Sequence, residues 1–187
     1  MRHGKITGTV TPGETDEKQL AAMMVGREVM LRIDKSQGRP GRTIFEVQHL
    51  TVAGSSGIEA VSDVSFRVRA GEIIGIAGVQ GNGQTELAEA VAGLRKVKAG
   101  SIRLSGKIMP SLNPRKMIEN GLAHIPEDRL KYGLVLPFSV AENQVLCSYY
   151  KAPFARFAWR NRYEMIQNSK TLIKRFDIRT NGPEAPV

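Results

Sequence analysis

The fold is decided by the stretch EIIGIAGVQGNGQTE, residues 72–86. An apolar, β-rich run ends at Gly78, a glycine-rich loop follows, and a helix-forming run begins at Thr85. This order is the context of a phosphate-binding loop, and the spacing fits the pattern G-x-x-x-x-G-K-[ST] except at one position. Gln84 stands where the pattern has lysine. The stretch therefore predicts an α/β nucleotide-binding fold of the P-loop NTPase type, without the cation that normally contacts the phosphates.

The residues of this loop keep the means to bind a nucleotide. Gly78, Gly81 and Gly83 allow unusual dihedrals and a close approach of the backbone, so that N–H groups and a helix N-terminus can surround phosphates. Thr85 keeps the hydroxyl that ligates Mg²⁺ in such loops. The predicted nucleotide-binding residues are Gly78, Gly81, Asn82, Gly83, Gln84, Thr85 and Glu86. The alternative is a chance glycine-rich turn, which the preceding apolar strand and the Ala/Leu-rich helix after Thr85 argue against.

Gln84 changes what the loop can do. A glutamine amide donates neutral hydrogen bonds worth about 0.5–1.5 kcal/mol, against roughly 1.5–3 kcal/mol for a charge-assisted one. We therefore expect ATP binding to be about tenfold weaker than with lysine. Losing one donor to developing charge typically slows a reaction about 100- to 1000-fold. The sequence predicts a site that binds ATP with poor turnover, and no residue is assigned a catalytic role.

Composition places the chain among soluble globular proteins. It has 187 residues, of which 41% are hydrophobic and 24% charged. No run approaches the roughly 18 apolar residues of a membrane-spanning helix, no secretory signal is visible, and a single cysteine excludes a disulfide framework. The net charge of +9 fits a nucleic acid, a membrane surface or a polyphosphate as partner, or simply solvated helix faces. Only 6% of the residues are aromatic and no known nucleic-acid motif is present, which disfavours the first.

The regular elements are predicted from caps, turns and periodicity. A hairpin is expected near residues 1–10, then a helix over 16–25 capped by Thr15 with an apolar core stripe, and a polar linker. Strands are expected over 44–52, 61–68, 73–77, 100–106 and 122–125, the third being a covered central strand. Helices are expected over 85–92, from Asn113 to Gly121, near 140–149 behind a Ser139/Glu142 capping box, and after Asn161.

Two stretches resemble the ATP-binding subunit of ABC transporters: VSDVSFRVRAGEIIGIAG, residues 61–78, and LAHIPEDR, residues 122–129. Glu127 and the loop form GNGQTE resemble importers of simple sugars or nucleosides with tandem ATPase domains, whose second domain has a degenerate loop. The resemblance implies an incomplete ABC ATPase core with an antiparallel β-subdomain and the start of the helical subdomain. Residues 1–33 would be the C-terminal remnant of the first ABC domain, 34–43 a linker, and 44–187 the N-terminal part of the second.

What the resemblance implies about function is specific. The chain would be the ATP-binding component, as a fragment, of an ABC-type importer for simple sugars or nucleosides, binding ATP and Mg²⁺ without hydrolysis. Thr85 and Glu127 would contact the metal. The partners would be transmembrane permease subunits, a substrate-binding receptor and a second ATPase domain or subunit, with no nucleic acid. The location would be cytoplasmic, peripheral on the inner face of the cell membrane.

The chain also departs from this family. It lacks the Leu-Ser-Gly-Gly signature, the general-base glutamate and the switch histidine; Leu104-Ser105-Gly106 is expected to be a plain turn, and His124 a packed residue on a strand. Glu127 either serves the phosphate site or pairs with Arg129 or Lys131. Later strands of such a domain are not present, so residues 73–77 should be poorly covered and solubility marginal. The alternatives are a non-hydrolytic nucleotide-binding regulatory module and an inactive truncated remnant.

Overall fold

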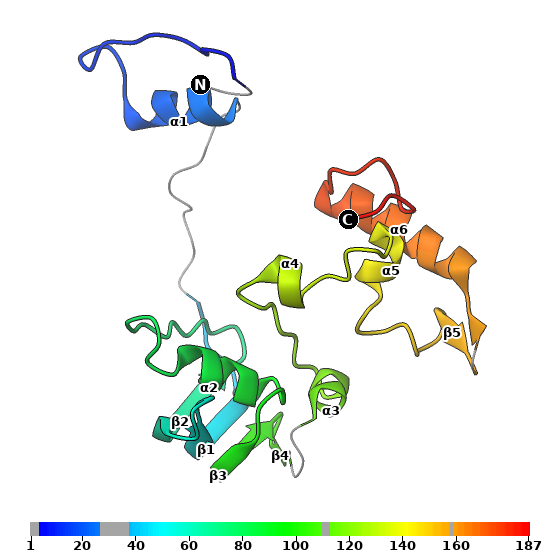
Figure 1. Ribbon diagram of the computed structural model, residues 1–187. Coiled ribbons are helices and arrows are strands. Elements are labelled where there is room, and N and C mark those ends of the chain that lie inside the picture. The colour runs from blue at the N-terminus through cyan, green and yellow to red at the C-terminus, as the bar shows by residue number, and fades with distance from the viewer. Residues whose placement is uncertain (1–3, 27–37, 110–112, 158) are drawn as a thin grey trace. The chain divides into compact units, whose positions relative to one another are not determined.

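The computed structural model describes residues 4–26, 38–109, 113–157 and 159–187. The chain forms two compact units, one ending at Pro40 and the other beginning at Gly41 (Figure 1). Residues 34–37 of the predicted linker and residues 1–3 of the predicted hairpin lie outside the described ranges.

In its described residues, the first unit contains one helix, α1 (Glu17–Val25). The carboxylate of Asp16 accepts the backbone N–H of Gln19 at 2.7 Å, so Asp16 caps the helix and the predicted cap, Thr15, is wrong by one residue. Gly26 ends the helix in the left-handed conformation, as expected. The predicted core stripe is also wrong, because no residue of α1 is buried. Among residues 4–10 the structure has an isolated β-bridge at Lys5 and no strand, and residues 1–3 of the expected hairpin lie outside the described ranges.

A four-stranded antiparallel sheet begins the second unit, in the order β2-β1-β3-β4. Its strands are β1 (Thr43–Ala53), β2 (Glu59–Arg69), β3 (Val97–Leu104) and β4 (Lys107–Ile108). The alternation predicted for β2 is confirmed: Val64, Phe66 and Val68 are partly buried, while the residues between them are exposed. Every pairing is antiparallel. The predicted antiparallel subdomain is therefore confirmed.

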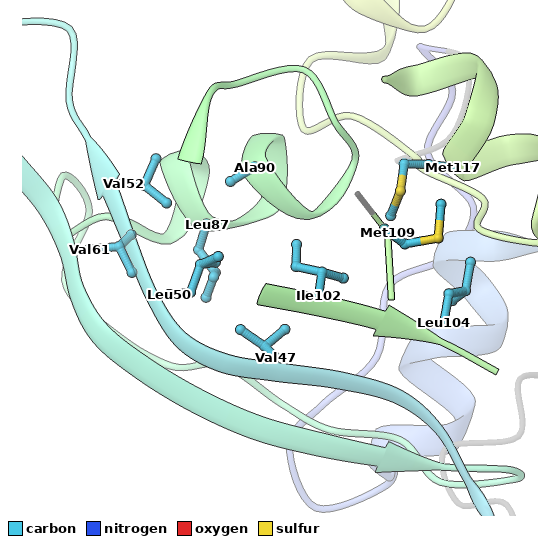
Figure 2. Packing of buried hydrophobic residues seen from close by; sticks show 10 residues of the cluster. All are labelled: Val47, Leu50, Val52, Val61, Leu87, Ala90, Ile102, Leu104, Met109 and Met117. Carbon is cyan, nitrogen blue, oxygen red and sulfur yellow. The ribbon is translucent and has the colours of Figure 1, made fainter. Parts of the chain in front are cut away.

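The hydrophobic core lies between this sheet and two helices (Figure 2). Leu50 and Ile102 of the sheet meet Leu87 and Ala90 of α2 (Gln84–Val91). Met117, which is fully buried, comes from α3 (Pro114–Glu119), whose predicted cap is confirmed by the bond from the N–H of Arg115 to the side-chain oxygen of Asn113. Burial of these side chains fixes α2, and with it the preceding glycine loop, against the sheet.

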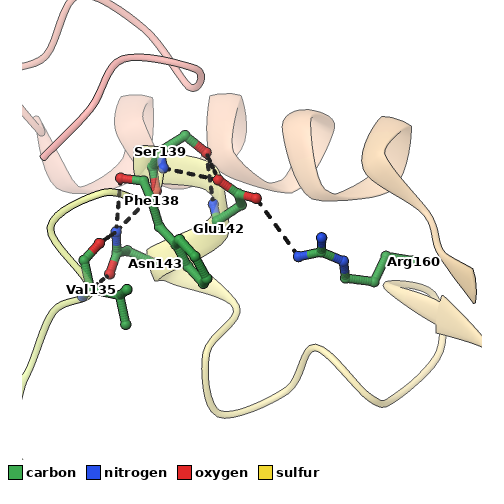
Figure 3. A network of polar contacts seen from close by, with 6 residues as sticks. All are labelled: Val135, Phe138, Ser139, Glu142, Asn143 and Arg160. Carbon is green, nitrogen blue, oxygen red and sulfur yellow. Dashed lines mark hydrogen bonds and ion pairs between the residues drawn. The ribbon is translucent and has the colours of Figure 1, made fainter. Parts of the chain in front are cut away.

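The C-terminal part contains short elements and one long helix. They are α4 (Arg129–Tyr132), α5 (Val140–Gln144), β5 (Ala155–Arg156), β6 (Trp159–Arg160) and α6 (Arg162–Phe176). The predicted capping box is confirmed, since Ser139 and Glu142 bond reciprocally at the start of α5 (Figure 3). The helix ends at Gln144, however, five residues before the predicted end. Asn161 caps α6, as predicted.

Two predicted strands do not form. Residues 73–77 and 122–125 have no strand partner among the described residues. Ile73 is 85% exposed and Ile76 57%, so the expectation of a covered central strand is wrong, whereas the expectation of poor cover is confirmed. An apolar run becomes a strand only where neighbouring strands pair with its N–H and C=O groups. No helix in the described part of the chain is long and apolar enough to cross a bilayer.

Candidate functional site

The last residue of the glycine loop (residues 78–83) packs against β2. Gly81 and Gly83 have φ of +91° and +95°. A Cβ atom on Gly83 would lie 2.2 Å from the carbonyl oxygen of Ala60, so a larger residue does not fit without moving the backbone. The N–H of Asn82 donates to the carbonyl of Val79 at 3.2 Å and closes a turn within the loop. The loop is therefore shaped by both its glycines and its contact with the strand.

The start of α2, just after the glycine loop, has the features of an anion-binding helix N-terminus. Gly83 is the N-cap and offers no side-chain bond, so the first backbone N–H groups of the helix, those of Gln84, Thr85 and Glu86, are not capped by it. The loop residues before Gly83 are exposed. Uncapped N–H groups and the positive end of the helix dipole attract an anion. Backbone donors can therefore reach a phosphate here.

Gln84 lies back over the loop. Its side-chain nitrogen donates to the carbonyl oxygen of Val79 at 3.3 Å. The same atom occupies the space beside Gly78, where an added Cβ would be only 1.8 Å from it. A neutral amide thus sits over the loop, where it can donate one of its hydrogens to a bound oxygen but supplies no positive charge. Gln84, which stands where the loop pattern has lysine, therefore lies beside the backbone N–H groups of the glycine loop.

A cleft of about 630 Å³ adjoins the start of α2 and brings the two predicted metal ligands together. Thr85 and Glu127 both line it, as does Gln84. Its volume is in the range of ligand pockets, roughly 300–1,000 Å³. A cleft of about 940 Å³ lies elsewhere, lined by α5 and the C-terminal residues. We assign the site to the smaller cleft because it alone of the two adjoins the glycine loop.

The segment before α4 corrects two expectations. His124 is exposed and lines the cleft, so it is not the packed strand residue that the sequence suggested. Glu127 is exposed and makes no ion pair with Arg129 or Lys131, which are both described, so the surface-pair alternative is not found. Asp128 has a structural role, because its carboxylate accepts the N–H of Lys131 at 3.0 Å and caps α4.

The residues present fit a phosphate ligand better than an independent metal site. Within the described ranges, no group of three or more His, Cys, Asp or Glu side chains could hold a metal ion. The hydroxyl of Thr85 and the carboxylate of Glu127 are hard oxygen donors, which suit Mg²⁺ when phosphate oxygens complete its coordination. Leu104-Ser105-Gly106 is the turn between β3 and β4, as predicted, and adds nothing to the site.

Apart from Gln84, Thr85 and Glu127, sequence reasoning assigned none of the side chains that line the cleft to the site, and two large ones were missed. Tyr132 lines it from α4, and Leu94 lines it just after α2. The capping residue Asp128 and the following Gly133 were the local signals for α4, but a helix of only four residues leaves little periodicity to read. Both residues add apolar surface to a cleft whose polar groups come from α2 and from residues 124–128.

Comparisons with known proteins agree on a family. A family model described as ABC transporter matches residues 61–183. The guanosine import ATP-binding protein NupO of Bacillus subtilis is 47% identical over 180 residues, which cover 96% of this chain and 35% of that protein. The glucose import ATP-binding protein TsgD13 of Haloferax volcanii is 38% identical over 179 residues, covering 96% and 32%. The chain thus spans about a third of the length of these curated relatives.

A solved structure resembles the fold. It is the dimeric ATP-binding cassette MJ0796 in a post-hydrolysis state bound to ADP and Pi, with a TM-score of 0.58 and 15% identity. The likeness covers 76% of this chain and 61% of that one. The fold is accordingly that of a P-loop ABC ATPase core, represented here by its antiparallel sheet, the loop and its helix, and the following helices.

Proposed function

Because this chain belongs to the ABC transporter family, we propose that it is an ATP-binding part of an importer for nucleosides or simple sugars. We further propose that it binds ATP at the glycine loop without hydrolysing it. The proposed substrate class follows the names of the relatives, a guanosine import ATP-binding protein and a glucose import ATP-binding protein. The observation that carries the proposal is the loop itself, a backbone cradle at the start of α2 with Gln84 folded over it.

Each predicted residue has a role in this proposal. The backbone N–H groups from Gly81 to Glu86 would hold the phosphates, and Gln84 would add a neutral hydrogen bond. The hydroxyl of Thr85 and the carboxylate of Glu127, which both line the cleft, would hold Mg²⁺. When bound, Mg²⁺ neutralises phosphate charge. No described residue is assigned as general base, so the bound nucleotide is expected to remain intact.

The wider assembly is part of the same proposal. Residues 1–33 are the C-terminal part of a first ABC domain, 34–43 a linker, and 44–187 the N-terminal part of a second, degenerate domain. The partners are transmembrane permease subunits, a substrate-binding receptor and a second ATPase domain or subunit. The location is the cytoplasmic side of the cell membrane, at its inner face. The relatives' names, which describe import ATP-binding proteins, support the permease partners and the location. The division into domains, the receptor and the second ATPase domain rest on the sequence resemblance.

Equilibrium binding of a fluorescent ATP analogue to the full chain, with and without Mg²⁺, tests the proposal. Wild type should bind saturably and more tightly with Mg²⁺, and unlabelled ATP should displace the analogue. Thr85→Val keeps the β-branched shape and removes the hydroxyl, so it should lose the Mg²⁺ enhancement while keeping Mg²⁺-independent binding. Thr171→Val, which changes an exposed position on α6, is the matched control and should behave as wild type.

Three outcomes separate this function from its alternatives. If the analogue shows no Mg²⁺-dependent binding even at millimolar concentration, the alternative of an inactive remnant is favoured. Binding that is retained without any effect on the ATPase activity of an added first domain would favour a separate regulatory module. Binding that falls steeply with salt and is displaced by DNA rather than ATP would indicate a nucleic-acid site.

A further inference from the structure

Residues 149–163, called here the aromatic–basic segment, concentrate two kinds of side chain. They contain six of the eleven aromatic residues of the chain and its only tryptophan. They also contain four basic residues and no acidic one. The glycine loop and its cleft use none of these residues. The composition therefore calls for an explanation apart from nucleotide binding.

Two short strands of the segment pair with each other. β5 and β6 pair antiparallel, with Ala155 opposite Arg160 and Arg156 opposite Trp159. The N–H of Asn161 donates to the carbonyl of Phe154 at 2.7 Å, and the N–H of Ala155 to that of Lys151 at 3.0 Å. These hydrogen bonds hold the backbone of the two paired strands, from which Arg156, Trp159 and Arg160 project.

Its largest apolar side chains face solvent. Phe157 is 95% exposed, Trp159 82% and Tyr163 68%. Each aromatic ring left in water forgoes the burial of a large apolar surface. The three rings lie within residues 157–163, and exposed apolar side chains that gather in this way mark interaction surfaces.

The charge on the hairpin remains positive after its ion pairs are taken into account. Arg160 lies 3.7 Å from Glu142 (Figure 3), and Arg162 pairs with Glu184. The pair of Arg162 is exposed on both sides, and the pair of Arg160 is long and only partly covered, so both are weak. Lys151 and Arg156 make no ion pair with any described residue. The aromatic rings thus stand beside cations that are open to an external anion.

We propose that the aromatic–basic segment docks directly on an anionic lipid bilayer surface. Tryptophan and tyrosine favour the membrane–water interface, where their rings enter the headgroup region. Arginine and lysine lay their apolar stems along the same region and keep their charge at the anionic headgroups. The exposed rings and cations of this hairpin match both requirements. Single-stranded nucleic acid also takes aromatic and basic side chains, but a bilayer is the surface beside which a transporter works.

This contact is independent of the nucleotide site. It would hold the chain at the membrane by lipid contact, in addition to any contact with a permease. Loss of ATP binding would therefore leave lipid binding intact, and the two proposals can fail separately.

Trp159 provides a local readout because the chain has no other tryptophan. The full wild-type chain is titrated with vesicles of phosphatidylglycerol mixed with phosphatidylcholine, and with vesicles of phosphatidylcholine alone. Trp159 emission should move to shorter wavelength with the anionic vesicles and become protected from an aqueous quencher. Co-sedimentation with the vesicles measures the partition coefficient independently.

Two variants, each with a matched control, test the chemistry. Arg156→Gln should weaken partitioning about fivefold, from roughly 1 kcal/mol per cation near an anionic surface. Arg42→Gln, the same change at an exposed position before β1, should leave it unchanged. Phe157→Ser should weaken partitioning about tenfold, from the apolar surface lost. Ile58→Ser, at another exposed apolar side chain, should not.

Three results would overturn the proposal. An unchanged Trp159 spectrum with anionic vesicles, even with co-sedimentation, would place the lipid contact elsewhere. An equal response to phosphatidylcholine alone would remove the role of the cations. A tighter response to a single-stranded oligonucleotide would assign the hairpin to nucleic acid.

Discussion

Replacing Gly83 by alanine is the sharpest test of how the glycine loop is built. Gly83 has φ of +95°, and its added Cβ would lie 2.2 Å from the carbonyl oxygen of Ala60. Gly81 has nearly the same φ, +91°, but its Cβ would meet nothing within 4 Å. Alanine at either position is therefore strained by a similar backbone conformation, and only alanine at position 83 also collides with β2. Gly81→Ala is accordingly the matched control.

The expected losses follow from these two terms. A left-handed backbone costs alanine roughly 1–2 kcal/mol, and the stiffer unfolded chain offsets about 0.4–1 kcal/mol of it. Gly81→Ala should therefore lower the free energy of unfolding by about 1 kcal/mol. Gly83→Ala must also displace well-packed backbone, which typically costs a further 1–3 kcal/mol or so, giving about 2–4 kcal/mol in total.

Urea unfolding followed by far-ultraviolet circular dichroism measures both variants. The denaturant slope should be unchanged, so that the shift in midpoint reports stability. Binding of the ATP analogue should fall more for Gly83→Ala, because Gly83 is the N-cap of α2. Equal losses of stability for the two variants would refute the reasoning, since the contact with Ala60 would then contribute nothing.

Two further predictions concern Gln84 and the start of α5. Gln84→Lys should tighten ATP binding about tenfold, because a charge-assisted bond replaces a neutral one. Calorimetry measures the affinity, and a separate assay should detect no phosphate release. Weaker binding would mean that the side chain does not face the phosphates. Glu142→Ala should lower the free energy of unfolding at neutral pH by about 1 kcal/mol, as for other lost caps. The N–H and hydroxyl of Ser139 donate to Glu142 and hold the pKa of its carboxyl below the ordinary value. Since the folded-state pKa is lowered, this stabilisation is present above the unfolded-state pKa and disappears as pH falls through the folded-state pKa. Urea midpoints across the acid range should therefore converge for wild type and variant, and a constant difference would contradict the assignment.

The features predicted correctly from the sequence were local ones. Asn113 with Pro114 and Ser139 with Glu142 each specify a helix start within a few residues, because a cap satisfies backbone donors of the first turn. The start of α2 followed from the glycine spacing and the helix-forming run after Gly83. The same locality explains the error at α1, where adjacent Thr15 and Asp16 are both capping residues. Position alone does not say which side chain reaches the N–H of Gln19.

The features predicted wrongly depend on distant partners. The apolar run of residues 73–77 has the composition of a buried strand, but no described strand pairs with it and Ile73 stays exposed. The hairpin of β5 and β6 was missed because two residues per strand leave no alternation to detect. In the candidate site, loop chemistry followed from spacing, and Glu127 from the family resemblance. The exposure of His124 and the place of Tyr132 required the fold.

One paired measurement tests directly whether the proposed nucleotide site binds ATP without turnover. Isothermal titration of the full chain with Mg-ATP and phosphate release from the same sample should be recorded together. The account predicts saturable, Mg²⁺-dependent binding and phosphate release no greater than in the absence of protein. Phosphate release that scales with the concentration of the chain, or no binding at millimolar Mg-ATP, would contradict it.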